Sequence, residues 1–189
     1  MTTPHFDDQG RAHMVNVSNK PTTRRFATVS AIVEMNEIAA GEIRRGTARK
    51  GDVLAVARLA GINGSKWTPM LIPLCHSIPV ESVEIDFQWI DDSMISTASR
   101  NLPPSRIGEF QGIHQLRVVA EVSTVAKTGI EMEAFTAVSV CCLTVIDMLK
   151  AVDRHIRVRN IQLETKSGGA SGEFVRGSSD VASEGQDSV

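Results

Sequence analysis

Asp147 and Lys150 are the residues whose types and spacing most clearly suggest chemistry. They lie near the end of a long apolar segment that starts at Thr128, and charged side chains on an apolar helix are costly unless they are paired. At 100° per residue they share one stripe with Thr136 and Ser139, and such a stripe can line a pocket. We expect the pairing to lower the pKa of the carboxyl group, and a carboxylate in contact with an ammonium group can serve acid/base catalysis. The same spacing also fits an ordinary ion pair at a solvated helix end.

Most lysines lie beside glycine or at the end of a predicted element. They are Lys50, Lys66, Lys127, Lys150 and Lys166. A lysine supplies a compact positive charge to an anionic group, and glycine-rich backbone such as 168–169 can add N–H donors beside it. These positions therefore suit phosphate binding. Lysines are also ordinary surface residues, so their positions alone leave both interpretations open.

His76 directly follows the apolar stretch 71–75. A histidine there can shuttle a proton or bind phosphate, or it can be a partly buried structural residue. Cys75 beside it suggests a zinc pair, but adjacent residues on an extended chain point apart and no second pair with ligand spacing follows. We therefore expect no metal site.

Glu131 and Glu133 open the predicted long helix. Carboxylates in a first turn stabilise the helix dipole; they can also accept hydrogen bonds from the amidine edge of a guanine-like ring. Cys141 and Cys142 lie in the middle of the same helix among apolar residues, so we expect them to pack in the core.

The composition excludes several classes of protein. The chain has 189 residues, 42% hydrophobic, and a formal net charge of −2, which argues against nucleic-acid binding by phosphate neutralisation and against general disorder. Three cysteines, two of them adjacent, do not suit a disulfide framework and indicate a reducing, cytoplasmic location. The N-terminus has no apolar run typical of a signal or an anchor, so we expect no membrane partner.

The length predicts one domain. Residues 1–25 are polar and are predicted to form a flexible arm, residues 26–166 the single catalytic domain, and residues 167–189 a flexible Ser/Gly-rich tail. Residues 100–112 are predicted to be an exposed insertion.

The pattern of elements predicts an α+β domain with a mainly antiparallel sheet and helices packed on one face. Asn36 and Asp52 are predicted N-caps, Gly61 a helix stop, and Thr128-x-x-Glu131 a capping box. The expected elements are strand 28–35, a helix to Arg45, helix 53–60, loop 64–76, strand 80–90, strand 94–99, strand 116–125, helix 128–152 and strand 156–165.

Several of these segments closely resemble the cyclic pyranopterin monophosphate synthases, the molybdenum cofactor biosynthesis protein C (MoaC) family. The resemblance runs in order from about His13 to Phe174. Its motifs are His13-Met14-Val15, Lys50-Gly51-Asp52-Val53, Ala60-Gly61-Ile62, Leu71 to His76, Lys127 to Ala134, Asp147-Met148-x-Lys150 and Lys166-Ser167-Gly168-Gly169.

The resemblance implies a lyase of molybdopterin formation with a ferredoxin-like fold. Its substrate would be the 3′,8-cyclised dihydro-GTP intermediate from a partner radical SAM enzyme, and its products cyclic pyranopterin monophosphate and diphosphate. It implies a homohexamer, a trimer of dimers, with each active site at a subunit interface. No metal or organic cofactor is implied, although Mg²⁺ with the triphosphate stays open.

The resemblance also implies roles for individual residues. Asp147 and Lys150 match the catalytic acid/base pair, and Lys50 matches another essential lysine. Lys66 and Lys166 are expected phosphate contacts. The substrate-binding segments are matched by Leu74, Cys75, His76, Glu131, Met132 and Glu133.

The chain departs from the family pattern at four positions. Asn16 stands where aspartate is usual, Ser77 where proline is usual, Ala170 where lysine is frequent, and Trp67 where a basic or polar residue is common. The substitutions at Asn16, Ser77 and Ala170 motivate an alternative function, a catalytically impaired oligomeric scaffold that binds a nucleotide or pterin phosphate. A third hypothesis is a thiol or metal enzyme that uses Cys75 and the histidine after it.

Overall fold

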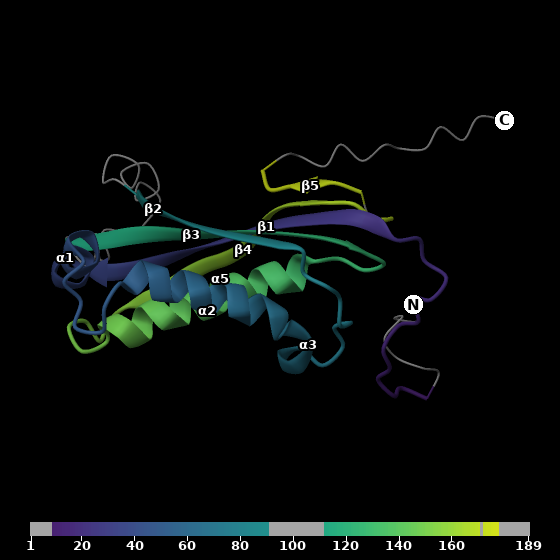
Figure 1. Ribbon diagram of the computed structural model, residues 1–189, viewed down its shortest axis with the longest axis horizontal. Helices are drawn as coiled ribbons and strands as arrows, with labels where there is room; N and C mark the ends of the chain where they lie inside the picture. Colours follow the sequence, from purple (N-terminus) through teal and green to yellow (C-terminus); the bar gives the residue numbers. More distant parts are fainter. Residues whose placement is uncertain (1–8, 91–111, 171, 178–189) are drawn as a thin grey trace.

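The computed structural model describes residues 9–90, 112–170 and 172–177 (Figure 1). Its elements, in chain order, are β1 (Thr23–Asn36), α1 (Glu37–Arg45), α2 (Val53–Lys66), α3 (Thr68–Leu71), β2 (Ser82–Ile90), β3 (Ile113–Ala126), α5 (Glu131–Leu149), β4 (Arg157–Ser167) and β5 (Phe174–Val175).

The strands form one antiparallel sheet in the order β2-β3-β1-β4-β5. Helices α2 and α5 lie side by side across one face of this sheet (Figure 1). This two-layer arrangement confirms the predicted α+β class and is consistent with a ferredoxin-like fold.

The core lies between the sheet and these two helices. Alternate residues of β1, from Ala27 to Met35, point toward the helices and are buried, and so do Leu116, Val118 and Ala120 on β3. Most of these side chains are alanine or valine. Small side chains on the sheet let α5 lie close to it. This close packing fixes the position of both ends of α5 relative to the sheet.

Helix α5 is long and apolar enough to cross a membrane by length and composition alone, and no other helix among the described residues meets that criterion. It is the central core helix, and 56% of its apolar window is buried. Contacts with β1, β3 and α2 account for that burial.

The two predicted helix caps are confirmed. The Asn36 side chain accepts a hydrogen bond from the Ala39 backbone N–H at 2.9 Å, and the Asp52 side chain accepts one from Ala55 at 3.0 Å. Each cap satisfies a donor that the first helical turn leaves unpaired. Asp52 thereby fixes the start of α2 directly after the loop that carries Lys50.

The predicted stop at Gly61 is wrong, because α2 continues to Lys66. A Cβ atom at Gly61 would lie 2.9 Å from the Ala137 carbonyl oxygen, and one at Gly64 would lie 2.9 Å from Val140 Cβ. These glycines let α2 and α5 approach closely. The last turn of α2, together with α3, also occupies part of the predicted loop 64–76.

The predicted capping box at the start of the long helix is also wrong. Helix α5 begins at Glu131, its N-cap is Ile130, and no side chain caps it. It ends at Leu149 rather than near Val152. Thr128 is left outside the helix, where it lines cavities described below.

The predicted boundaries of the domain are too narrow at both ends. β1 begins at Thr23, inside the predicted arm, and β5 pairs with β4 from within the predicted tail. The start of β1 and strand β5 are both ordered by pairing with a neighbouring strand. That pairing satisfies their backbone N–H and C=O groups. The strand predicted at 94–99 and residues 100–111 of the predicted insertion lie outside the described residues.

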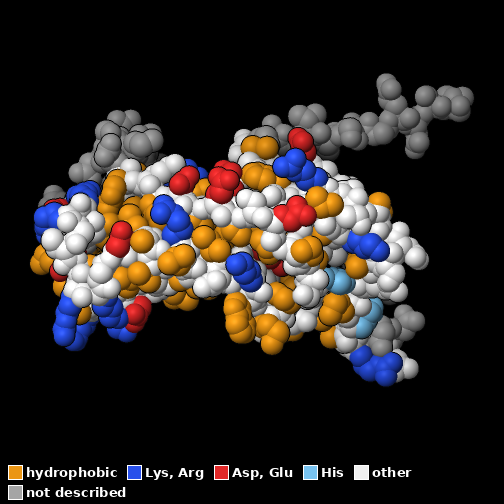
Figure 2. Space-filling view, in the orientation of Figure 1, with side chains coloured by type: hydrophobic (Ala, Val, Ile, Leu, Met, Phe, Trp, Pro, Cys, Tyr) orange, Lys and Arg blue, Asp and Glu red, His pale blue; other side chains and the backbone are white. Residues whose placement is uncertain are grey.

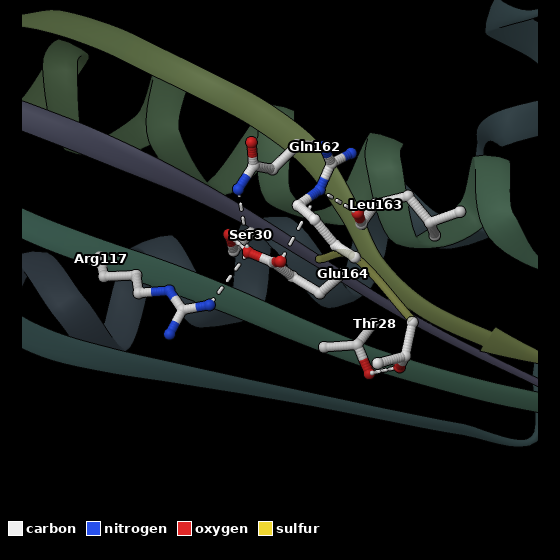
Figure 3. A network of polar contacts seen from close by, with 8 residues as sticks. Thr28, Ser30, Arg117, Gln162, Leu163 and Glu164 are labelled. Atoms are coloured by element: carbon white, nitrogen blue, oxygen red, sulfur yellow. Dashed lines mark hydrogen bonds and ion pairs between the residues drawn. The ribbon is translucent and has the colours of Figure 1, made fainter. Parts of the chain in front are cut away.

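The sheet face away from the helices carries polar contacts between strands (Figure 3). Arg117 and Gln162 donate to the Glu164 carboxylate at 3.0 and 3.2 Å, and the Ser30 hydroxyl donates to it as well. Desolvation opposes these hydrogen bonds, but together they lower the pKa of Glu164. These contacts tie β1, β3 and β4 together on the face opposite the helices.

Candidate functional site

Three charged groups meet at the C-terminal end of α5. Lys150 Nζ lies 2.5 Å from Asp147 Oδ1, and Lys50 Nζ lies 2.6 Å from Asp147 Oδ2. Lys50 also donates to the Asp147 carbonyl oxygen at 2.9 Å. The predicted contact between Asp147 and Lys150 is present, and the structure adds Lys50 from the α1–α2 loop. We call these three residues the lysine–aspartate cluster.

Ion pairing dominates the electrostatics of this cluster. Hydrogen bonds from Lys150 and then from Lys50 lower the pKa of Asp147 to about 2. The Asp147 side chain is 55% exposed, so water also solvates the charge. At neutral pH the carboxylate is ionised and holds two ammonium groups, which can donate protons or stabilise an anion.

Thr136, which the sequence places on the same stripe as this cluster, is bound within its own helix. Thr136 is buried, and its hydroxyl donates to the Met132 carbonyl oxygen at 2.8 Å within the same helix. A threonine hydroxyl bound in this way satisfies its own donor.

A second group of polar residues surrounds a cavity of about 150 Å³ at the N-terminal end of α5. We call it the ring cavity. Six of the eight residues predicted to bind substrate line it, all but Lys66 and Lys166, although they come from two segments far apart in the sequence. Its lining consists of Leu74, Cys75, His76, Thr128, Gly129, Glu131, Met132 and Glu133.

Glu133 is the carboxyl group at this end of α5 whose pKa departs from its ordinary value. Its side chain is buried, with 3% of the residue exposed. Burial, with a further contribution from the charge of Glu131, raises its pKa to about 7, against a backbone hydrogen bond that lowers it. A carboxyl group that titrates near neutral pH can both donate and accept a proton.

Cys75 and His76 also line the ring cavity. Burial, together with the charge of Glu133, raises the pKa of the Cys75 thiol, so the thiolate that a nucleophile requires is disfavoured. His76 Nε2 donates to the Val15 carbonyl oxygen at 2.8 Å, which ties the segment before β1 to the cavity. Among the described residues, no group of three His, Cys, Asp or Glu side chains is arranged to hold a metal ion.

A larger cavity, of about 650 Å³, adjoins the ring cavity. Thr128 and Gly129 line both. Three cationic side chains gather in it, Lys20, Arg25 and Lys127, and we call it the cationic cavity. Its other lining residues are Pro21, Thr23, Gly169 and Ala170.

Sequence reasoning missed Lys20 and Arg25, because both fall in the segment interpreted as a flexible arm. A signal in the sequence could have found Arg25. It lies two residues before Ala27 on β1, so its side chain is on the same, helix-covered face of the sheet. Lys127 donates to the Ser18 carbonyl oxygen at 2.7 Å, which holds the same arm against the cavity.

The two lysines expected to contact phosphate lie in different places. Lys166 pairs with Ala27 in the β1–β4 ladder, so its side chain is on the same sheet face as Arg25, although it is not one of the residues that line the cationic cavity. Lys66 is exposed at the end of α2. No described contact joins Lys66 to the cationic cavity or to the lysine–aspartate cluster.

The predicted site residues therefore form two groups at opposite ends of one helix. Sixteen residues separate Glu131 from Asp147, and a rise of about 1.5 Å per residue places them roughly 24 Å apart. A single chain does not bring the lysine–aspartate cluster to the ring cavity.

The fold and these two polar groups define a small α+β enzyme with acid/base and anion-binding side chains. The model of the MoaC family matches residues 14–169. A cyclic pyranopterin monophosphate synthase from Rhodopirellula baltica is 51% identical over 94% of this chain and 95% of its own length. Proteins of the same name from Cereibacter sphaeroides and Syntrophomonas wolfei are 46% and 44% identical, over 90% and 93% of this chain and 94% and 99% of their own lengths.

The chain belongs to the MoaC family. It is accordingly an enzyme of molybdenum cofactor biosynthesis, and the predicted lyase class is confirmed.

Proposed function

We propose that this chain is a cyclic pyranopterin monophosphate synthase. It converts the 3′,8-cyclised dihydro-GTP intermediate, supplied by a radical SAM enzyme, to cyclic pyranopterin monophosphate and diphosphate. The observation that carries the proposal is the adjacency of the two cavities: a ring cavity with a carboxyl group of pKa about 7 opens beside a cavity with three cations. A substrate with a purine-derived ring and a triphosphate needs both.

The ring cavity suits the purine-derived part of this substrate. Glu131 and Glu133 offer carboxylate oxygens to the N–H groups of a guanine-like edge, and Leu74 and Met132 offer apolar contact to its faces. The positive end of the α5 dipole also points to this end of the molecule.

The cationic cavity suits the triphosphate. The Arg25 guanidinium can hold a phosphate through two parallel hydrogen bonds, whereas Lys20 and Lys127 act as point charges. Lys166 adds a fourth charge from the same sheet face. Mg²⁺ bound to the triphosphate is compatible with this arrangement, and we propose no other cofactor.

The chemistry needs proton transfers and charge stabilisation. Opening the imidazole ring and building the pterin moves protons at several atoms, which Glu133 and the lysine–aspartate cluster can carry. The cyclic phosphate forms when a substrate hydroxyl oxygen bonds to the α-phosphorus and the bond from that phosphorus to the diphosphate oxygen breaks. Lys50 and Lys150 can stabilise the charge that develops on the departing diphosphate.

The separation of about 24 Å between the two ends of α5 supports a site shared between subunits. We propose a homohexamer, a trimer of dimers, in which the lysine–aspartate cluster of one subunit completes the cavities of its neighbour. Figure 2 shows hydrophobic side chains gathered over the helix layer. Leu59, Met70 and Leu143 are 64%, 75% and 62% exposed there, and burial against a second copy would stabilise the assembly. We propose a cytoplasmic location for it.

The decisive experiment supplies the purified full-length chain with the cyclised intermediate, generated in situ, and follows cyclic pyranopterin monophosphate and diphosphate by mass spectrometry. We expect product from the wild type and none from Lys50→Ala. Bound intermediate without turnover in the wild type would contradict the synthase and favour the scaffold hypothesis. Ala170 is the observation behind that alternative, because it lines the cationic cavity where the family frequently carries a lysine.

A further inference from the structure

The Arg25 side chain is held by few hydrogen bonds. Its Nη2 donates to the Lys127 carbonyl oxygen at 3.1 Å. In the part of the chain that the structure describes, its Nε and the Thr23 hydroxyl are buried without a hydrogen-bond partner. Packing must therefore fix the orientation of the guanidinium plane.

Gly169 supplies that packing. A Cβ atom added to Gly169 would lie 2.1 Å from Arg25 Nη1 and 2.9 Å from its Cζ, so the guanidinium lies directly against the glycine backbone. The φ angle of Gly169 is +80°, in the region that favours glycine. The backbone of this turn and the absence of a side chain together create the space that Arg25 occupies.

The preceding glycine has a different role. A Cβ atom at Gly168 would lie 2.3 Å from the Arg24 carbonyl oxygen, which is backbone and cannot move without disturbing β1. At Gly169 the clashing atoms are the far end of a flexible side chain. An alanine at 169 would therefore displace the Arg25 guanidinium, whereas an alanine at 168 would strain the sheet.

We propose that Gly169 is a positioning residue that holds the Arg25 guanidinium in the cationic cavity for phosphate binding. This inference rests on the proposed function of that cavity. An arginine forms two parallel hydrogen bonds with a phosphate only when its planar fork has the correct orientation. The role of Gly169 is to leave the space in which the guanidinium can take this orientation against the backbone.

The test measures binding of inorganic triphosphate to the full-length protein by calorimetry. We expect Gly169→Ala to weaken the affinity roughly tenfold, the scale of one lost charge-assisted hydrogen bond. Gly177→Ala is the matched control, because Gly177 has a φ of +86° and nothing within 4 Å of an added Cβ. Both variants place an alanine at a positive φ, and only Gly169→Ala displaces Arg25, so a loss of affinity in Gly169→Ala alone is the expected result.

A double variant separates the possible causes. In an Arg25→Lys background the branched guanidinium is gone, so we expect Gly169→Ala to change the affinity less than twofold. An equal loss with and without Arg25 would overturn the proposal, and so would a Gly169→Ala affinity that matches Gly177→Ala. If Arg25→Ala and Arg25→Lys both leave triphosphate binding unchanged, the proposed phosphate site itself is wrong, and Gly169 has no such role.

Discussion

The two ends of helix α5 shift the pKa of a carboxyl group in opposite directions. At the N-terminal end burial raises the pKa of Glu133 to about 7, and at the C-terminal end two lysines lower the pKa of Asp147 to about 2. Both residues belong to the same helix and the same sequence pattern. The difference shows that the surroundings decide whether a carboxylate exchanges protons near neutral pH or stays charged as a partner for cations.

The two ends also differ in what surrounds them. The N-terminal end meets two cavities and the segment before β1, whereas the C-terminal end faces solvent. The lysine–aspartate cluster lies at the exposed end, and the ring and cationic cavities lie at the buried end. The proposed site uses both features, so the proposal includes a second copy of the chain.

The largest expected effect tests whether the two ends act together. We expect Asp147→Asn and Glu133→Gln each to reduce turnover roughly 10²- to 10⁴-fold, the usual contribution of an acid/base group. When the two variants are co-expressed with different tags and purified as mixed oligomers, about a quarter of the shared sites regain both intact ends. Product formation should therefore recover to about a quarter of the wild-type rate per site.

Asp86→Asn is the control for this experiment, because Asp86 is an exposed carboxylate on β2 at the sheet face away from the helices. Its turnover should equal that of the wild type. Mixed oligomers that stay inactive, although each variant assembles normally, would mean that the two ends do not serve one site.

A smaller effect concerns stability at the buried end. In the unfolded chain Glu133 loses its proton near its ordinary pKa of 4.5, whereas in the folded protein it keeps the proton to about pH 7. The unfolded state therefore binds fewer protons between these values, and the free energy of unfolding falls by on the order of 2 kcal/mol as the pH rises through them. Glu133→Gln should remove this loss, as urea unfolding at pH 5 and pH 8 would measure.

Glu131→Gln is the matched control in the same helical turn. It leaves the burial of Glu133 intact, and burial is the main cause of the raised pKa, so it should retain most of the pH dependence. If Glu133→Gln and the wild type lose stability equally between pH 5 and 8, then Glu133 is already ionised in the folded protein.

The smallest effect concerns the response of the two carboxyl groups to salt. At about 1 M salt the screening length is roughly 3 Å, so the pKa of Asp147 should rise from about 2 toward its ordinary 3.8. The pKa of Glu133 should stay near 7, because salt does not reverse desolvation. Carboxyl NMR titrations would report both, and equal responses would show that the two ends do not differ in physical cause.

The sign of the Asp147 contribution follows from its lowered pKa. Its ion pairs stabilise the folded protein above the unfolded pKa of 3.8, and this stabilisation is lost as the pH falls through about 2. Lys150→Ala should raise the pKa of Asp147 more than Lys50→Ala does, because the hydrogen bond from Lys150 is the larger cause.

Local rules predicted those parts of the fold that depend on nearby residues. Asn36 and Asp52 cap their helices as expected, because a cap needs only a side-chain oxygen three residues before a backbone N–H. The same rules failed at Gly61, where contact with α5 decides. They also failed at Thr128, because the loop before α5 lines two cavities instead of capping the helix.

The candidate site was predictable to a similar extent. Spacing alone predicted the contact between Asp147 and Lys150, because residues three apart on a helix are neighbours. The position of Lys50 beside a glycine made it a candidate for phosphate binding, but only the family resemblance placed it with the catalytic residues, and Arg25 did not enter the prediction. Both reach their sites from segments far away in the sequence, where no periodicity relates them to their partners.

The sequence by itself determined the α+β class, the long core helix and the identity of most chemically capable side chains, since composition, periodicity and motifs are local properties. Only the tertiary structure decided which distant segments join the two ends of that helix: Lys50 meets Asp147 at one end, and residues 74–76 line a cavity with Glu133 at the other. It also decided that Glu133 is buried and Asp147 exposed. Burial and charge contacts depend on which distant segments pack together, and those two quantities set every pKa on which the chemistry depends.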